Sequence, residues 1–370
     1  MKKSIKIILV AGARPNFMKI APLIKAVRAY NRVRGRGRRI IPFLVHTGQH
    51  YDDNMSALFL RELGIPAPDI NLEVGSGSHA DQTARIMLAF EPVCLREKPD
   101  WVVVVGDVNS TAACSLVAAK LAIRIAHVEA GLRSFDRGMP EEINRLVTDA
   151  LADLLFTPSA DANENLRREG IPASKIRFVG NIMIDALVAN LEKAERSKLP
   201  SQLGLKPRGF AYVTLHRPSN VDDGANLRAL MRELGRLSRK MPVVFPVHPR
   251  TRKMLSGLGG RGKDEPGLLL LEPVGYHDSL WLARHAAFVL TDSGGLQEET
   301  TYFKTPCLTL RPNTERPVTI KLGTNKLTSL RTLRADIRAI LDGPRPRGRI
   351  PKYWDGRTSG RIVKALLEAG

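Results

Sequence analysis

The amino-acid sequence predicts an α/β protein built on two doubly wound, parallel sheets. Short apolar runs rich in β-branched residues alternate with amphipathic stretches, for example residues 109–121 and 226–240. Continuous apolar runs are typical of strands covered on both faces, and the helices between them supply the cover. The predicted strands are residues 5–10, 40–45, 101–105, 123–128, 211–215, 242–247, 267–271, 286–290 and 306–310.

Chain length and strand distribution predict two domains. With 370 residues, 43% of them apolar, the chain can bury more than one core. A break near residues 170–180 separates two halves of comparable strand content. We therefore expect a first domain over residues 1–175 and a second over 176–355, with a last helix within 356–370 packing back on the first.

Composition excludes several classes of protein. The net charge of +20 suits polyanions, but its densest basic runs, residues 32–39 and 345–349, lie in Gly/Pro-rich loops without interleaved aromatics, so no nucleic-acid partner is predicted. Lys6 interrupts the apolar start, which favours a buried strand over a secretory signal, and no run is long enough to predict membrane insertion. Three scattered cysteines fit a cytoplasmic location without disulfides.

Polar and glycine residues follow the predicted strands directly. Parallel strands in such sheets carry their ligand loops at their carboxyl ends, so these residues are expected to share one cleft. The segments are residues 12–14, 47–50, 106–107, 129–131, 215–217, 247–250 and 292–295.

Residues 291–299, TDSGGLQEE, are the most informative of these segments. Ser293, Gly294 and Gly295 let the backbone approach a ligand closely, and the N–H groups that open the next helix would then face a phosphate. Glu298 and Glu299 follow one turn later, where they either favour the helix start or reach the attached sugar. An ordinary strand-to-helix turn has the same composition.

Two cations begin the first predicted helix. Arg14 and Lys19 oppose the helix dipole unless an anion lies between them, so a bound phosphate or carboxylate is one explanation. The alternative is that both side chains reach into solvent.

Several carboxylates lie past neighbouring buried strands. Asp107 and Glu129 each follow a strand, while Glu141 and Glu142 open a helix after Pro140. Carboxylates that share a cleft divide into acid and base roles. Asp107 also suits a helix cap, and acidic residues suit a first helical turn, whereas Glu129 precedes no helix start.

Histidines end two strands of the second half, at His216 and His248. A structural role is the alternative for each. Neither metal-ligand spacing nor a dinucleotide or Walker glycine pattern is present, so no metal, nicotinamide or ATP is predicted.

Read together, these segments resemble the non-hydrolysing UDP-N-acetylglucosamine 2-epimerase family over nearly the whole chain. The resemblance implies the glycosyltransferase-B fold, in which two facing Rossmann-like domains hold a nucleotide sugar between them. It implies reversible conversion of UDP-N-acetylglucosamine to UDP-N-acetylmannosamine through UDP elimination and a 2-acetamidoglucal, with no cofactor, and a homodimer. The motifs are GARPNFMKIAPL, HTGQHYDDNM, VVGDVNST, HVEAGLRS, MPEEINR, GNIMIDAL, TLHR, PVHPRT, TDSGGLQEE and NTERPV.

The resemblance also implies roles for individual residues. Those implied to bind UDP are Arg14, His216, Ser293, Gly294, Gly295, Glu299 and Arg316, and those implied on the sugar side are Lys19, Asp107, Glu129, Glu141 and Arg145. Asp107, Glu129 and Glu141 form the expected acid/base set, and His216 neutralises the departing phosphate. Gln49 and His50 match the segment of a second, regulatory site. The alternatives are a UDP-2,3-diacetamido-glucuronate 2-epimerase, a hydrolysing relative, or a glycosyltransferase of the same fold.

Overall fold

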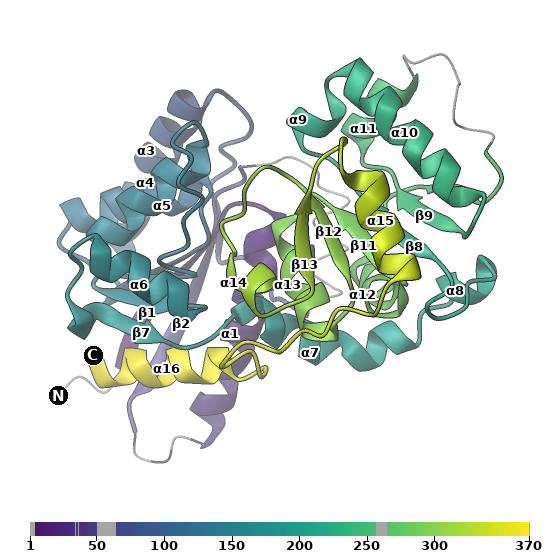
Figure 1. The fold of residues 1–370 in the computed structure, drawn as a ribbon. Coiled ribbons are helices and arrows are strands. Elements are labelled where there is room, and N and C mark those ends of the chain that lie inside the picture. The colour runs from purple at the N-terminus through teal and green to yellow at the C-terminus, as the bar shows by residue number, and fades with distance from the viewer. Residues whose placement is uncertain (1–3, 34, 36, 50–63, 257–264, 370) are drawn as a thin grey trace. The chain divides into compact units, whose positions relative to one another are not determined.

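The computed structural model describes residues 4–33, 35, 37–49, 64–256 and 265–369, and its chain divides into two compact units (Figure 1). The first unit comprises Met1–Val188 together with Lys352–Gly370, and the second comprises Ala189–Pro351. Each unit has its own sheet and its own core, and we describe them separately.

The first unit is built on a parallel sheet in the order β3-β2-β1-β4-β5-β6-β7. Its strands are β1 (Ser4–Ala11), β2 (Arg39–His46), β3 (Ile70–Asn71), β4 (Trp101–Val105), β5 (Arg124–Val128), β6 (Leu154–Thr157) and β7 (Ile176–Phe178). The order of its first six strands is that of a doubly wound Rossmann sheet, which reverses direction between β1 and β4.

Helices flank this sheet along the chain. They are α1 (Arg14–Val33), α3 (His79–Glu97), α4 (Asn109–Lys120), α5 (Pro140–Leu151), α6 (Ala160–Arg168), the 3-10 turn η1 (Ala173–Lys175) and α16 (Thr358–Ala369), and the chain passes into the second unit within α7 (Ile182–Glu195). All five residues of β4 are buried, and α3 and α4 pack Phe90 and Cys114 into the core on one face of the sheet. α16 packs against α1 at the other end of the sequence (Figure 1).

The second unit repeats the same topology with the strand order β10-β9-β8-β11-β12-β13, again all parallel. Its strands are β8 (Ala211–Thr214), β9 (Val243–Pro246), β10 (Leu268–Leu271), β11 (Phe288–Thr291), β12 (Cys307–Leu310) and β13 (Asn325–Thr328). Its helices are α8 (Leu199–Gln202), α9 (Pro218–Val221), α10 (Gly224–Ser238), α11 (Pro249–Ser256), α12 (Tyr276–His285), α13 (Gly294–Phe303), α14 (Val318–Lys321) and α15 (Leu333–Asp342).

The predicted α/β class and all nine predicted strands are confirmed. Sequence patterns missed the short strands β3, β6, β7 and β13, of which β13 carries only one large apolar residue, Leu327. β7 directly follows the expected domain boundary at residue 175, yet it pairs with β6 of the first unit. A strand that short depends on its neighbour for stability, so local composition gave no signal for it.

Candidate functional site

Several of the predicted site residues, among them Asp107, His216 and Ser293, follow the strands at the reversal point of each sheet. In the first unit, the loops after β1 and β4 lie side by side at the carboxyl ends of paired strands. In the second unit, the loops after β8 and β11 have the same relation. Doubly wound sheets bind their ligands at these points, because the connections on either side leave in opposite directions.

Lys19 and Glu129 form a buried ion pair in the first unit. Lys19 lies one turn into α1, and its Nζ contacts Oε2 of Glu129; the two residues are 6% and 4% exposed. Within the described part of the chain, the buried Oε1 of Glu129 has no hydrogen-bond partner. One oxygen of the Glu129 carboxylate is therefore paired with an ammonium group. The other is available to accept a proton or a hydrogen bond from a hydroxyl group.

The backbone of Glu129 is held in a left-handed conformation, with φ of 73°. The N–H groups of Glu129 and Ala130 both donate to the carbonyl of Phe156 at 3.1 Å, and that of Gly131 donates to Asp149 Oδ2 at 2.9 Å. A non-glycine residue in this region costs about 1–2 kcal/mol and persists only where its surroundings fix it. The fold thus strains this turn to direct the Glu129 carboxylate toward Lys19.

Asp107 is joined to α5 rather than to the helix it precedes. Val108 is the N-cap of α4 and makes no side-chain capping bond, so a capping role for Asp107 is excluded. Instead, its carboxylate binds Nη1 of the buried Arg145, whose Nε binds Glu142 at 2.9 Å. Asp107 keeps 29% of its side chain exposed and accessible to a ligand.

Glu142 anchors the loop before α5. It accepts hydrogen bonds from the Ser134 N–H at 3.0 Å and the Phe135 N–H at 2.9 Å. Burial opposes its ionisation, but these bonds and Arg145 hold the pKa of Glu142 below its ordinary value. The neighbouring Glu141 is half-buried in the first turn of α5. Local patterns did not separate the two, because both are first-turn acids, and only the family resemblance favoured Glu141.

Asn16 organises the turn after β1. Its Oδ1 accepts from the N–H groups of Gly12 and Ala13 at 3.0 and 2.9 Å, and its Nδ2 donates to the carbonyl of Val105 at 3.0 Å. Arg14 begins α1, and its side chain lies outside the described part of the structure. Asn16 was missed, although a buried polar residue in the first turn of a helix is a usable signal.

Gln49, one of the two predicted regulatory residues, is buried in the first unit. Its Oε1 accepts from the Ser110 hydroxyl at 2.8 Å, and its backbone carbonyl accepts from Gln82 Nε2 at 3.1 Å. His50 lies outside the described residues. The regulatory role of both remains a prediction.

His216 and Asp292 form the reversal point of the second sheet. His216 Nδ1 lies 3.0 Å from Oδ1 of Asp292, while its ring is 44% exposed. Fully buried Asp292 also accepts from the N–H of Arg217 at 2.9 Å and from Asn220 Nδ2 at 3.0 Å. Burial opposes its ionisation, yet His216 and these donors keep the pKa of Asp292 below its ordinary value. The carboxylate therefore orients His216 and leaves Nε2 for a ligand.

The predicted helix start at residues 293–295 is confirmed. Ser293 is the N-cap of α13 and makes no side-chain capping bond. A Cβ at Gly294 would lie 2.5 Å from Arg316 Nη1, so only glycine lets the arginine come so close. Half-buried Ser293, Gly294 and Gly295 thus present a helix N-terminus beside a guanidinium, an arrangement suited to a phosphate.

Two carboxylates hold Arg316. Its Nε donates to Glu298 at 2.7 Å, and its Nη1 contacts Glu315, which also binds Arg311 at 2.8 Å. Although Glu315 is buried, the two arginines keep its pKa well below the usual range. Glu298 therefore serves Arg316 rather than the helix start, and no acid occupies the first turn of α13.

Glu299 lies beside Tyr276 in the interior of the second unit. Burial raises the pKa of Glu299 to about 8; Tyr276 opposes this rise and the nearby Glu298 adds to it. A carboxyl group that gains its proton so readily can donate as well as accept hydrogen bonds. Such a group suits the hydroxyls of a ribose.

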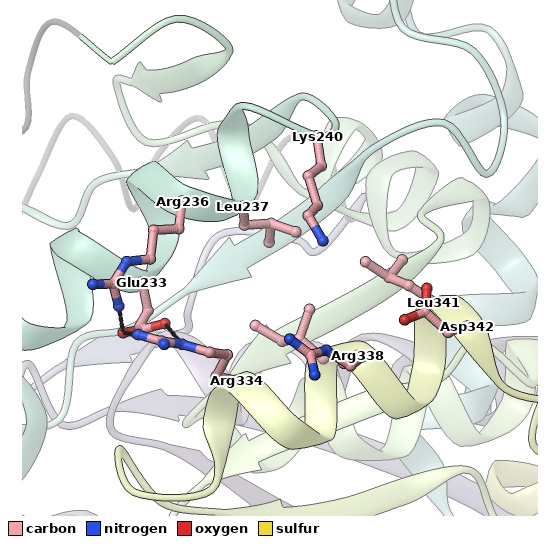
Figure 2. A pocket seen from close by; sticks show the side chains of 9 residues that line it. Glu233, Arg236, Leu237, Lys240, Arg334, Arg338, Leu341 and Asp342 are labelled. Carbon is pink, nitrogen blue, oxygen red and sulfur yellow. Dashed lines mark hydrogen bonds and ion pairs between the residues drawn. The ribbon is translucent and has the colours of Figure 1, made fainter.

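A separate cavity of about 210 Å³ lies between α10 and α15 (Figure 2). Its lining includes the buried Leu237 and Ile337 as well as Glu233, which binds Arg236 and Arg334 at 2.6 and 2.7 Å. None of its lining residues is a predicted site residue. Among the residues described, no cluster of three or more His, Cys, Asp or Glu side chains offers a metal site, and no helix can span a membrane.

The fold and the two strand-end sites define the class of this protein: an α/β protein of the glycosyltransferase-B type, with two Rossmann-like units. A model of the family described as UDP-N-acetylglucosamine 2-epimerase matches residues 36–367. The chain is 44% identical to the UDP-N-acetylglucosamine 2-epimerase of Methanococcus maripaludis, across 98% of both chains. It belongs to the UDP-N-acetylglucosamine 2-epimerase family.

Two further comparisons bear on specificity and fold. The chain is 39% identical to the UDP-2,3-diacetamido-2,3-dideoxy-D-glucuronate 2-epimerase of Pseudomonas aeruginosa, across 98% of this chain and 99% of that one. A crystal structure of the Methanocaldococcus jannaschii UDP-GlcNAc 2-epimerase, in complex with UDP-GlcNAc and UDP, is similar with a TM-score of 0.88 and 40% identity. It matches 98% of this chain and 100% of that one.

Proposed function

We propose that this protein interconverts UDP-N-acetylglucosamine and UDP-N-acetylmannosamine by eliminating and re-adding UDP. The observation that carries the proposal is the Lys19–Glu129 pair, a buried carboxylate with an available oxygen on a strained turn. Family membership supports the same reaction, since relatives named for it match almost the whole chain. No oxidant takes part in this chemistry.

The reaction begins with loss of the proton at the acetamido-bearing carbon. The electrons of that C–H bond form a double bond to the anomeric carbon, and the anomeric C–O bond breaks as UDP leaves with its electron pair. The anomeric carbon of the glycal then recovers the UDP oxygen, while a proton adds to the opposite face of the acetamido-bearing carbon. The carbon that loses the proton is not activated by a carbonyl, so a positioned base and a stabilised leaving group are both required.

In this proposal, Glu129, Asp107 and Glu141 form the acid/base set. Lys19 pairs with Glu129 and Arg145 pairs with Asp107, so each carboxylate is held in place by a cation. A carboxylate that has taken a proton can return one on the other face.

The second unit would hold the leaving UDP. The start of α13 and Arg316 would bind the diphosphate, and His216, oriented by Asp292, would neutralise charge as the anomeric bond breaks. Glu299 would accept or donate hydrogen bonds to the ribose. For Arg14, in the first unit, UDP binding is proposed on the strength of the family resemblance alone.

Purified protein incubated with UDP-N-acetylglucosamine, without NAD or metal, tests the proposal. Proton NMR should show a second anomeric signal from the manno epimer. Glu129→Gln should reduce the rate at which this epimer forms by about 10²-fold or more. Lys6–Glu97, another Lys–Glu pair of the first unit at 2.7 Å, provides the matched control, since Glu97→Gln should retain the wild-type rate. Equal rates for Glu129→Gln and wild type would refute the assignment of Glu129.

A second candidate substrate is UDP-2,3-diacetamido-glucuronate, favoured by the 39% identity to the Pseudomonas aeruginosa relative. Both sugars lose the same proton, so the residues above serve either reaction. Comparing kcat/KM for the two sugars decides between them. Product that forms only after addition of a sugar acceptor would instead indicate a glycosyltransferase.

We also propose that the protein is a cytoplasmic homodimer. Leu88 and Leu95 lie two turns apart on one face of α3 and are 73% and 56% exposed, so a second copy would bury them. Leu88→Glu combined with Leu95→Glu should halve the mass measured by light scattering, whereas Val33→Glu on α1 should not. The free, buried thiols of all three cysteines fit a reducing compartment.

A further inference from the structure

A buried histidine–aspartate pair in the first unit contacts the turns that carry Asp107 and Glu129. His127, on β5, and Asp149, on α5, are 0% and 1% exposed, and Nδ1 of the ring lies 2.6 Å from Oδ1 of the carboxylate. The other ring nitrogen, Nε2, lies 2.8 Å from the backbone carbonyl of Gly106. Neither residue touches a group to which the reaction above assigns a chemical role.

The His127 ring bridges two fixed acceptors. A carbonyl oxygen only accepts, so Nε2 donates to Gly106 while Nδ1 faces Asp149. Burial opposes ionisation of Asp149, but His127 and Arg133 keep its pKa below the ordinary value. Asp149 also contacts Arg133, which in turn binds Glu169, so the pair belongs to a larger buried group.

This pair joins the two turns that carry the proposed acid/base residues. Through the ring, it fixes the peptide between Gly106 and Asp107. Through its second oxygen, Asp149 holds the Gly131 N–H at 2.9 Å and thereby the far end of the strained Glu129 turn. One buried network thus sets the position of the Asp107 turn relative to the Glu129 turn.

We propose that His127 and Asp149 are positioning residues, which keep Asp107 and Glu129 in register for proton transfer at the acetamido-bearing carbon. This inference rests on the proposed epimerase activity. Misplacement of a reacting group by about 1 Å costs roughly 10²-fold in rate. The pair acts through the backbone, so UDP binding in the second unit is not affected by its loss.

Three variants of the protein test the inference. His127→Gln offers one amide NH2 to the two acceptors that the ring bridges, so its amide oxygen faces Asp149 or the Gly106 carbonyl. Asp149→Ala removes the partner of Nδ1, whereas Asp149→Asn can still hydrogen-bond to it. We expect kcat to fall about 10²-fold in the first two, with a larger kinetic isotope effect for substrate deuterated at the acetamido-bearing carbon, since proton transfer becomes slower. Asp149→Asn should stay within about tenfold of wild type, and Kd for UDP should be unchanged throughout.

A buried residue outside this network provides the control. Trp354 is 2% exposed and donates through Nε1 to the carbonyl of Pro158 at 2.9 Å, so Trp354→Phe should lower Tm without changing the isotope effect. A His127→Gln enzyme whose kcat falls only with its folded fraction, at the wild-type isotope effect, would overturn the inference.

Amide hydrogen exchange separates this inference from the proposed function. His127→Gln should speed exchange at residues 106–107 and 129–131, and Trp354→Phe should not, whether or not the protein epimerises this sugar. Inactive wild type would refute the proposed function alone. Unchanged exchange at both turns in His127→Gln would refute the positioning role alone.

Discussion

A comparison of Gly106→Ala with Gly170→Ala separates two effects, namely the strain of a left-handed backbone and the displacement of Lys19. Gly106 has φ of 69°, and a Cβ there would lie 2.7 Å from Nζ of Lys19. Gly170 has φ of 81° and nothing within 4 Å of its Cβ position, so Gly170→Ala imposes the same kind of strain without a collision. The two variants differ in whether the added methyl group collides with Lys19.

Both substitutions should cost about 1–2 kcal/mol, because an L-residue is strained in this region. For a domain of this size, each kcal/mol lowers Tm by about 2–4 °C. The collision adds little to the loss of stability, since the end of a lysine side chain can shift and still stay beside its carboxylate. Its effect falls on activity, because the shifted ammonium no longer fixes the position of the buried Glu129 carboxylate.

The assay is steady-state epimerisation alongside thermal unfolding. We expect similar Tm values for the two variants, but a kcat about 10²-fold lower for Gly106→Ala than for Gly170→Ala. Equal kcat values at equal Tm would refute the claim that the position of Lys19 is required.

Three other predictions concern the second unit. Glu299→Gln should remove a pH dependence of stability. Because the pKa of Glu299 is raised to about 8 in the folded protein, its contribution to stability is complete below its ordinary pKa and is lost as pH rises to about 8. Between those limits, the wild-type free energy of unfolding should fall by up to about 1.4 kcal/mol per pH unit relative to the variant. Glu315→Gln removes the buried carboxylate that pairs with Arg311 and Arg316, so it should lower the free energy of unfolding, measured in denaturant, by about 3–5 kcal/mol. Because the pKa of Glu315 is lowered in the folded protein, the stability difference between wild type and variant should shrink as pH falls below about 4. Asp292→Asn should cost about 1–3 kcal/mol of stability and weaken UDP binding measured by calorimetry, since His216 loses its orienting charge.

Sequence periodicity was sufficient for the architecture, because strands buried on both faces have continuous apolar runs. It also located the strand ends where Asp107, Glu129, His216 and Ser293 lie, since the sheet direction follows from the alternation of strands and helices. Local patterns do not determine which side chains meet across the sheet.

Partners supplied by tertiary structure were therefore missed. Asp292 directly follows a buried strand, and His127 interrupts another; each is a polar residue that must find partners in the core. That requirement is visible in the sequence, but the identity of the partner is not. Glu315 shows the same limit, because its two arginines are close in sequence and only the fold makes the cluster buried.

Epimerisation in heavy water tests the central claim most directly. Protein incubated with UDP-N-acetylglucosamine and no cofactor should yield the manno epimer with deuterium at the acetamido-bearing carbon, because the removed proton exchanges with solvent before another is added. An epimer that retains its original proton at that carbon would contradict proton abstraction by the Glu129 set, and absence of any epimer from protein that binds UDP would contradict the activity itself.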